Sequence, residues 1–273
     1  MAGNRRKYKV HVPVILLGVP LSRVENGYLA APTTARLEMV FEQASKGGII
    51  LDWNGPPTYS DSMRYARLFL SKLVEELELD SGIYARIALD NPDALNLPEA
   101  GIYASLTGIL LYAIAREYGE TPGVDDIIEM SRMLDQLEYV AGWERVMDAL
   151  RYSALLGAIT VYRNDEEHGE IRRGTVKVTR KIVVESHGQR LDEKLLGPDV
   201  YGAVAHLVGT IVLEAAVRIR ELENPDGERI YRALEPLLQV SSPILSSFWG
   251  VRAEGLIVSP GFPRRFEIVS ITR

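Results

Sequence analysis

The spacing of hydrophobic positions predicts strands at the start of the chain. Apolar and polar residues alternate around Leu37, Met39 and Phe41, and this period of two is typical of a half-buried strand. An Asn26–Gly27 pair before them indicates a tight hairpin turn. We therefore predict an antiparallel run of strands at residues 8–20, 35–43 and 47–53.

Later segments switch between helical and strand periods. Apolar residues three and four apart predict helices at 61–79, 98–115, 124–138, 142–156, 198–223 and 226–239, and a short helix from Ser241. Alternation predicts further strands at 83–89, 158–163, 174–186, 253–259 and 266–273. This irregular interleaving predicts an α+β fold. The polar segment 163–173, RNDEEHGEIRR, is predicted to be an exposed loop and a domain boundary.

Composition narrows the class of protein. Hydrophobic residues make up 47% of the 273 positions and the net charge is −6, which disfavours nucleic acid as a partner. The chain has no cysteine, and its four histidines lie far apart without metal-ligand spacing, so we expect no bound metal. No apolar run of about 18 residues is evident; we expect no membrane partner and a cytoplasmic location. Only 11 Asn and Gln beside many Glu, Arg and Lys is a thermophile tendency.

Three segments resemble one family of small-molecule kinases. Residues 12–32, VPVILLGVPLSRVENGYLAAP, are similar to its first hairpin, and residues 98–115, PEAGIYASLTGILLYAIA, to its phosphate loop and following helix. Residues 250–271, GVRAEGLIVSPGFPRRFEIVSI, are similar to its closing strand, turn and strand. By element order and these motifs, nearly the whole chain resembles the GHMP superfamily, which comprises galactokinase, homoserine kinase, mevalonate kinase, phosphomevalonate kinase and related decarboxylases.

The resemblance implies a two-lobed fold. The amino-terminal lobe, residues 1–170, would be like domain 2 of ribosomal protein S5, and the carboxyl-terminal lobe, residues 171–273, would be ferredoxin-like, with a cleft between them. It also implies nucleotide contacts from Gly101, Ser105 and Gly261. Asp148 lies near the place where many members carry a catalytic carboxylate, which could accept a proton from a substrate hydroxyl. ATP and Mg²⁺ would be the cofactors.

The phosphate loop departs from the family pattern in ways that make ATP binding doubtful. The family loop relies on glycines and small hydroxyls at a helix start. Here Tyr103 replaces a glycine, Ala104 replaces a serine, and Glu99 adds a negative charge near the helix start. The Ser-Gly that usually precedes the catalytic Asp is absent. Ser105 is therefore interpreted either as a phosphate or Mg²⁺ contact or as a packed helix residue.

Two interpretations are open for the pair Arg264 and Arg265, and two for Asp148. Arg264 and Arg265 could bind a small anionic metabolite, because a guanidinium suits phosphate or carboxylate; otherwise they form a charged turn. Asp148 is either a proton acceptor or a solvated helix residue beside Arg145 or Arg151. Two functions follow: an ATP-dependent kinase of a small metabolite, or related decarboxylase, with an altered nucleotide site; or a non-catalytic binding or regulatory protein on the same scaffold, which could form a homodimer.

Overall fold

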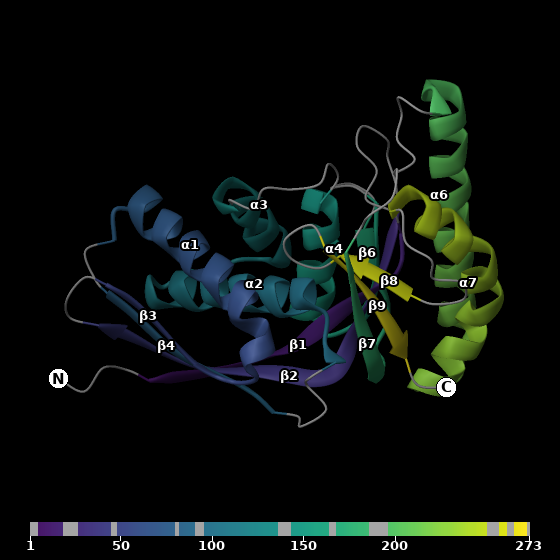
Figure 1. Ribbon diagram of the computed structural model, residues 1–273. Coiled ribbons are helices and arrows are strands. Elements are labelled where there is room, and N and C mark those ends of the chain that lie inside the picture. The colour runs from purple at the N-terminus through teal and green to yellow at the C-terminus, as the bar shows by residue number, and fades with distance from the viewer. Residues whose placement is uncertain are drawn as a thin grey trace.

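A mixed sheet carries helices on both of its faces (Figure 1). The computed structural model describes residues 5–18, 27–44, 48–79, 82–90, 96–135, 143–163, 168–185, 196–249, 257–260 and 265–271. The strands are β1 Arg6–Leu17, β2 Tyr28–Ala44, β3 Ile49–Asn54, β4 Gly82–Leu89, β5 Ile159–Tyr162, β6 His168–Arg172, β7 Val178–Glu185, β8 Ile257–Pro260 and β9 Arg265–Ile271. The helices are η1 Pro57–Tyr59, α1 Ser60–Glu76, α2 Glu99–Glu117, α3 Val124–Leu134, α4 Trp143–Leu156, α6 Pro198–Glu221 and α7 Gly227–Trp249. The predicted α+β class is confirmed.

The long strand β2 is the centre of the larger sheet. It pairs antiparallel with β1 along most of its length, with β4 through its second half and with β5 through its first. β3 joins β4 in parallel, and β6 joins β5. The second half of β2 alternates between buried and half-buried residues, as the sequence predicts, whereas residues 28–33 are all buried. The first half is therefore covered on both faces, which is why alternation is absent there.

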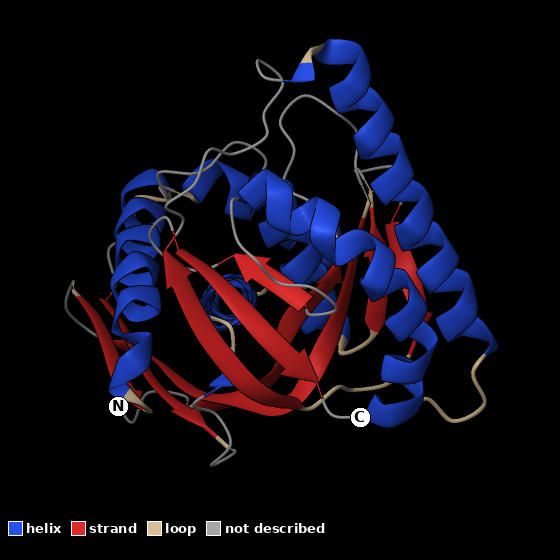
Figure 2. Ribbon diagram, turned by 45° about the vertical axis from the view of Figure 1, so that its right-hand side comes forward, coloured by secondary structure: helices blue, strands red, loops and turns tan. Residues whose placement is uncertain are grey.

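Two hydrophobic cores explain this double coverage. One core lies between the sheet and α1–α4 and includes Phe41, Phe69 and Ile102. The other lies on the opposite face, where Leu16 and Leu29 of the β1–β2 pair meet α6, α7 and β9. Figure 2 shows helices on both sides of the strands. Side chains that alternate along β1 and β2 thus supply both cores from the same two strands.

The carboxyl-terminal segments form a smaller layer. β7, β9 and β8 make a three-stranded antiparallel sheet in that order, and the backbone of Val176 bonds to that of Pro32 and Thr34 on β2. By length and composition α6 would qualify as a membrane span. Seven of its residues are nevertheless buried, among them Ala205, Val212 and Ile219, as in a helix packed by one face on a sheet. The division into lobes at residue 170 stays a prediction.

Two predicted elements are wrong. Residues 168–172 form β6 instead of a loop, because their backbone pairs with β5 and polar side chains do not prevent an edge strand from forming. The two helices predicted around residue 240 are one helix, α7, which contains Pro236 and Pro243. Proline disfavours a helix interior. Burial of Ile230, Leu234 and Leu238 stabilises α7 in spite of its prolines.

Helix α2 lies unusually close to β1. A side-chain carbon placed on Gly101 would come within 2.1 Å of the carbonyl oxygen of Pro13, so only glycine permits this approach. At Gly108, two turns further along the same helix, the nearest atoms would be side-chain atoms of Leu155, at 3.5 Å or more. The two glycines therefore have different physical roles.

We predict opposite effects of alanine at these two glycines. Gly101→Ala should lower the free energy of unfolding by about 2–3 kcal/mol, because backbone atoms must move apart. Gly108→Ala, the matched control, should raise it by about 0.5–1 kcal/mol through helix propensity. Urea denaturation of both variants measures this. Equal effects in both variants would contradict the close approach of α2 to β1.

Candidate functional site

The beginning of α2 is packed against other parts of the protein. The hydroxyl of Tyr59 accepts a hydrogen bond from the amide of Leu97 at 3.0 Å and lies 3.2 Å from its carbonyl oxygen. The hydroxyl of Ser62 donates to the carbonyl oxygen of Glu99 at 3.1 Å. Glu99 itself is only 7% exposed. Side chains from η1 and α1 thus cover the place where the sequence resembles a phosphate loop.

Gly101 and Ser105 are both buried within this packing. Gly101 faces the backbone of Pro13, as described above. The hydroxyl of Ser105 lies 2.9 Å from the carbonyl oxygen of His11 and 2.8 Å from that of Gly101. A hydroxyl carries one proton and two lone pairs, so its proton is directed at protein carbonyls. This geometry favours the interpretation of Ser105 as a packed helix residue; its role in nucleotide binding stays a prediction.

Asp148 lies at the centre of a buried ionic network. It is 1% exposed, so it is not a solvated helix residue. Its Oδ2 accepts a hydrogen bond from Nε of Arg132 at 2.8 Å, and Nη2 of Arg132 donates to the hydroxyl of Tyr162 at 2.5 Å. The second carboxylate oxygen, Oδ1, is buried without a hydrogen-bond partner. Helix α3, helix α4 and strand β5 therefore meet at one carboxylate.

A second ionic pair lies beside the first. Nη1 and Nη2 of Arg151 each donate to one oxygen of Asp135 at 2.8 Å, a bidentate arrangement. Tyr103 donates its hydroxyl proton to Asp135 at 2.6 Å, and Arg151 also contacts the hydroxyl of Thr107 at 3.1 Å. The guanidinium is fully buried. The side chain of Tyr103, at a position where the family resemblance implies a glycine, therefore links α2 to the residue that follows α3.

Burial raises the pKa of Asp148 from its usual 3.8 to about 6. The positive charges of Arg132 and Arg151 oppose this rise, while the negative charge of Asp135 adds to it. Loss of hydration disfavours the ionised form more than the two guanidinium groups favour it. A carboxyl group with this pKa changes protonation close to neutral pH, as proton-transferring groups often do.

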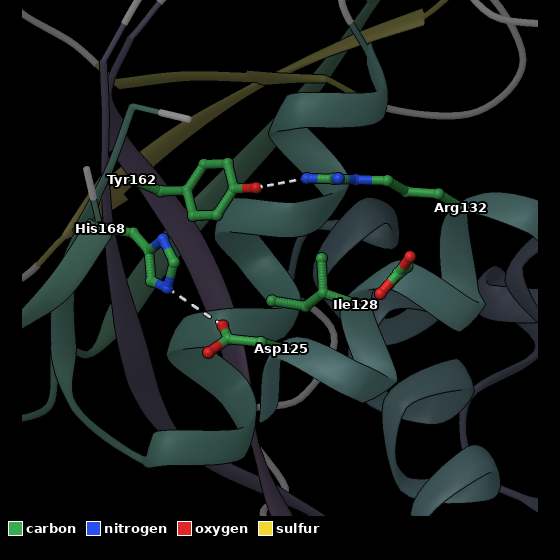
Figure 3. A pocket seen from close by; sticks show the side chains of 6 residues that line it. Asp125, Ile128, Arg132, Tyr162 and His168 are labelled. Atoms are coloured by element: carbon green, nitrogen blue, oxygen red, sulfur yellow. Dashed lines mark hydrogen bonds and ion pairs between the residues drawn. The ribbon is translucent and has the colours of Figure 1, made fainter. Parts of the chain in front are cut away.

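An open pocket has Arg132 among its lining residues. It has a volume of about 240 Å³ and is lined by Asp125, Ile128, Glu129, Arg132, Tyr162 and His168; we call it the α3 pocket. Figure 3 shows Nε2 of His168 directed at Asp125 and the Tyr162 hydroxyl directed at Arg132. The His168–Asp125 distance is 3.0 Å. The His168 and Tyr162 rings stack with centroids 5.5 Å apart.

The structure describes only some of the predicted site residues. Gly101, Ser105 and Asp148 lie in the amino-terminal helices, while Gly261 and Arg264 fall outside the described residues. Arg265 begins β9, and its side chain is outside the described part as well. Within that part, no group of three or more His, Asp or Glu residues could hold a metal ion. The roles of these residues in nucleotide binding, catalysis and anion binding stay predictions.

Sequence reasoning named only some of the neighbours of Asp148. Arg151, one turn further along α4, was named by its helical spacing, and its charge does act on Asp148. Arg132 and Tyr162 come from other elements, and nothing in the local pattern joins them to residue 148. The only signal in the sequence was a set of charged residues within otherwise apolar helices, which does not specify their pairing.

Comparison with solved structures identifies the fold. Mevalonate kinase from L. major matches with a TM-score of 0.63 and 13% identity, covering 98% of this chain and 88% of that one. Mevalonate kinase from Staphylococcus aureus MRSA252 gives 0.56 and 12%, covering 97% and 90%. Phosphomevalonate kinase from Streptococcus pneumoniae gives 0.55 and 7%, covering 97% and 91%. The chain has the GHMP-kinase fold.

The GHMP fold is shared here without close sequence similarity. No protein-family profile and no curated protein matches the sequence. Because one GHMP fold carries kinases of different substrates, the fold does not determine the activity. The residues of this GHMP-like site must therefore be judged by their own geometry.

We predict a distinctive pH dependence of stability from Asp148. Its raised pKa means that the folded state binds the proton more tightly, so the associated stability is present below pH 4 and is lost as the pH rises through about 6. A rise from 3.8 to about 6 corresponds to about 3 kcal/mol. Relative to the parent, Asp148→Asn should therefore become progressively more stable between pH 4 and pH 7.

The measurement is the denaturation free energy of both proteins at pH 4, 5, 6 and 7. Glu76→Gln, at an exposed position on α1, serves as the control and should show a flat difference from the parent. A flat difference for Asp148→Asn as well would mean that the buried carboxylate has an ordinary pKa.

Proposed function

We propose that this chain is a non-catalytic binding protein built on the GHMP-kinase scaffold. The observation that carries the proposal is the packing at the start of α2. In the resemblance, that turn would present backbone amides to the phosphates of ATP. Here the start of α2 is covered by side chains of η1 and α1 and lies against β1, so the turn does not fit a triphosphate.

Three features of the turn support this. Glu99 places a carboxyl group in the first turn of the helix, where it competes with an anionic ligand for the helix dipole. Tyr59 and Ser62 occupy backbone groups next to it. Gly101 contributes a close contact with β1 instead of space for a ligand. Each feature alone would weaken a phosphate site, and together they oppose both the charge and the room that a phosphate needs.

One observation favours a second candidate, phosphoryl transfer to a small hydroxy acid. Asp148 is buried, has a pKa of about 6 and carries an oxygen without a hydrogen-bond partner, properties that suit a proton acceptor. The structural neighbours include an enzyme in complex with R-mevalonate, so R-mevalonate is the substrate to test. However, Arg132 and Tyr162 separate this carboxylate from the α3 pocket, which supports the binding function instead.

Thermal unfolding with ATP and Mg²⁺ tests the proposal. A ligand that binds only the folded state raises its stability by mass action. We expect a dissociation constant no tighter than about 1 mM, so 1 mM nucleotide should add no more than about 0.4 kcal/mol. Isothermal titration should show no saturable binding in the micromolar range.

A matched assay separates the two candidates. The protein is incubated with ATP, Mg²⁺ and R-mevalonate, and formation of ADP is followed against the Asp148→Asn variant. The proposal predicts the same background rate in both proteins. Micromolar ATP affinity would overturn the closed nucleotide site on which the proposal rests. Turnover that Asp148→Asn abolishes would overturn the binding function and establish the second candidate.

A further inference from the structure

Strand β1 lies at an edge of the larger sheet. Among the described strands it pairs with β2 alone, and β2 pairs with β4 and β5 on its other side. The backbone amide and carbonyl groups of Arg36 both bond to Asp90, so they point away from His11, the residue opposite Arg36 on β1. Because backbone direction alternates along a strand, His11, Lys9 and Lys7 turn their own amide and carbonyl groups away from β2.

The first half of this outer edge has open hydrogen-bonding groups. Within the described part of the chain, no group bonds to the backbone of Lys7 or Lys9 on that side. A row of unpaired amide and carbonyl groups is a template on which a further strand can pair.

A groove with a volume of about 250 Å³ lies beside the same edge; we call it the β1 groove. Tyr8, Lys9 and Val10 line one side of it. Consecutive side chains of a strand point to opposite faces, so a groove lined by three consecutive residues lies along the strand edge. The other side is apolar and consists of Ile109, Tyr112, Pro122, Val124, Ile127 and Leu155. All of these except the two isoleucines are half-buried, so they present apolar surface to the opening.

The exposed face of β1 carries a row of cations. Arg5, Lys7 and Lys9 alternate along the chain and are exposed. Arg5 and Lys9 each pair with a glutamate of β2. Lys7 lies opposite Val40, and no ion pair to Lys7 occurs among the described residues. A strand added at this edge would therefore meet an uncompensated positive charge on one face and the apolar groove on the other.

These charges disfavour a second copy of the chain as the occupant. Pairing of β1 with β1 about a two-fold axis would place the cations of both copies on one face of the joined sheet. Like charges on opposed strands destabilise a sheet, whereas acidic side chains beside Lys7 would stabilise it. Charge complementarity thus selects an acidic partner.

We propose that the β1 edge binds an extended peptide in which acidic and apolar residues alternate, as an added strand. The peptide backbone bonds to Lys7 and Lys9, its acidic side chains lie beside Lys7, and its apolar side chains enter the β1 groove. Main-chain bonds supply affinity in this mode of recognition and alternate side chains supply specificity. The edge is separate from the start of α2, so this inference goes beyond the proposed function and does not rest on it.

Three capped, fluorescently labelled octapeptides test the pattern. One has four Glu–Val repeats, the second has four glutamates followed by four valines, and the third has four Lys–Val repeats. Fluorescence anisotropy at one fixed ionic strength compares them, because salt screens exposed charges. We expect saturable binding of the Glu–Val repeat with a dissociation constant below about 100 μM, and binding at least tenfold weaker for the other two.

N-methylated peptides test for strand pairing. Only every second amide of a paired strand faces its neighbour. Methylation of either the glutamate amides or the valine amides of the Glu–Val repeat should therefore abolish binding, and methylation of the other set should leave it unchanged.

Single substitutions locate the binding. Lys7→Gln should weaken the Glu–Val repeat about three- to fivefold, the effect expected of one exposed ion pair. Val124→Ser should weaken it about threefold or more, because apolar contact in the groove is lost. Lys177→Gln and Val217→Ser change exposed residues outside the groove; they are the matched controls and should bind as the parent does.

Each contrary result overturns the inference. Equal binding of both methylated peptides would exclude strand pairing, and equal binding of the second peptide would exclude recognition of alternation. Binding that survives Lys7→Gln and Val124→Ser together would lie elsewhere on the protein. A dimer that takes no peptide would assign the edge to a second copy. A monomer that takes no peptide would show that the cations only protect the edge from association.

Discussion

The buried pair between Arg151 and Asp135 holds the amino-terminal helices together. A guanidinium without exposure to water is tolerable only when its donors are matched, and here Asp135 receives two of them while Thr107 and Tyr103 complete the network. Removing one member of such a pair leaves an uncompensated buried charge, at a cost of about 3–5 kcal/mol. The positions of α2, α3 and α4 therefore depend on this interaction.

The same network explains why the start of α2 is closed. Tyr103 must reach Asp135, which fixes the rotation of α2 about its axis. Gly101 then faces β1 at close range and Ser105 faces the carbonyl oxygen of His11. A helix held on three sides in this way cannot move to admit a phosphate group without disturbing its neighbours. The close packing at the start of α2, on which the proposed binding function rests, and the stability of the helix layer are thus two consequences of one arrangement.

The charges around α3 are divided between interior and surface. Asp148 neutralises Arg132 from the inside, where low polarity strengthens the attraction between them. Asp125 and Glu129 are exposed and line the same pocket as Arg132.

The sequence by itself determined the class of fold and most of its elements. The alternation around Leu37, Met39 and Phe41 located the second half of β2, and helical spacing located α2 and α4, because these patterns follow from one-sided burial of a strand or helix. The resemblance of residues 98–115 to a phosphate loop placed α2 within a known family of folds. It also exposed Tyr103 and Glu99 as departures, since those changes are visible residue by residue.

Only the tertiary structure decided how the charged residues pair and what the departures do. Arg132, Asp148 and Tyr162 are brought together from α3, α4 and β5, and such contacts depend on the packing of whole elements. The edge strand β6 formed because β5 offered it a partner, while its own residues predicted a loop. The continuity of α7 through two prolines likewise came from burial of its apolar face, because tertiary packing outweighs local propensity when enough apolar surface is removed from water.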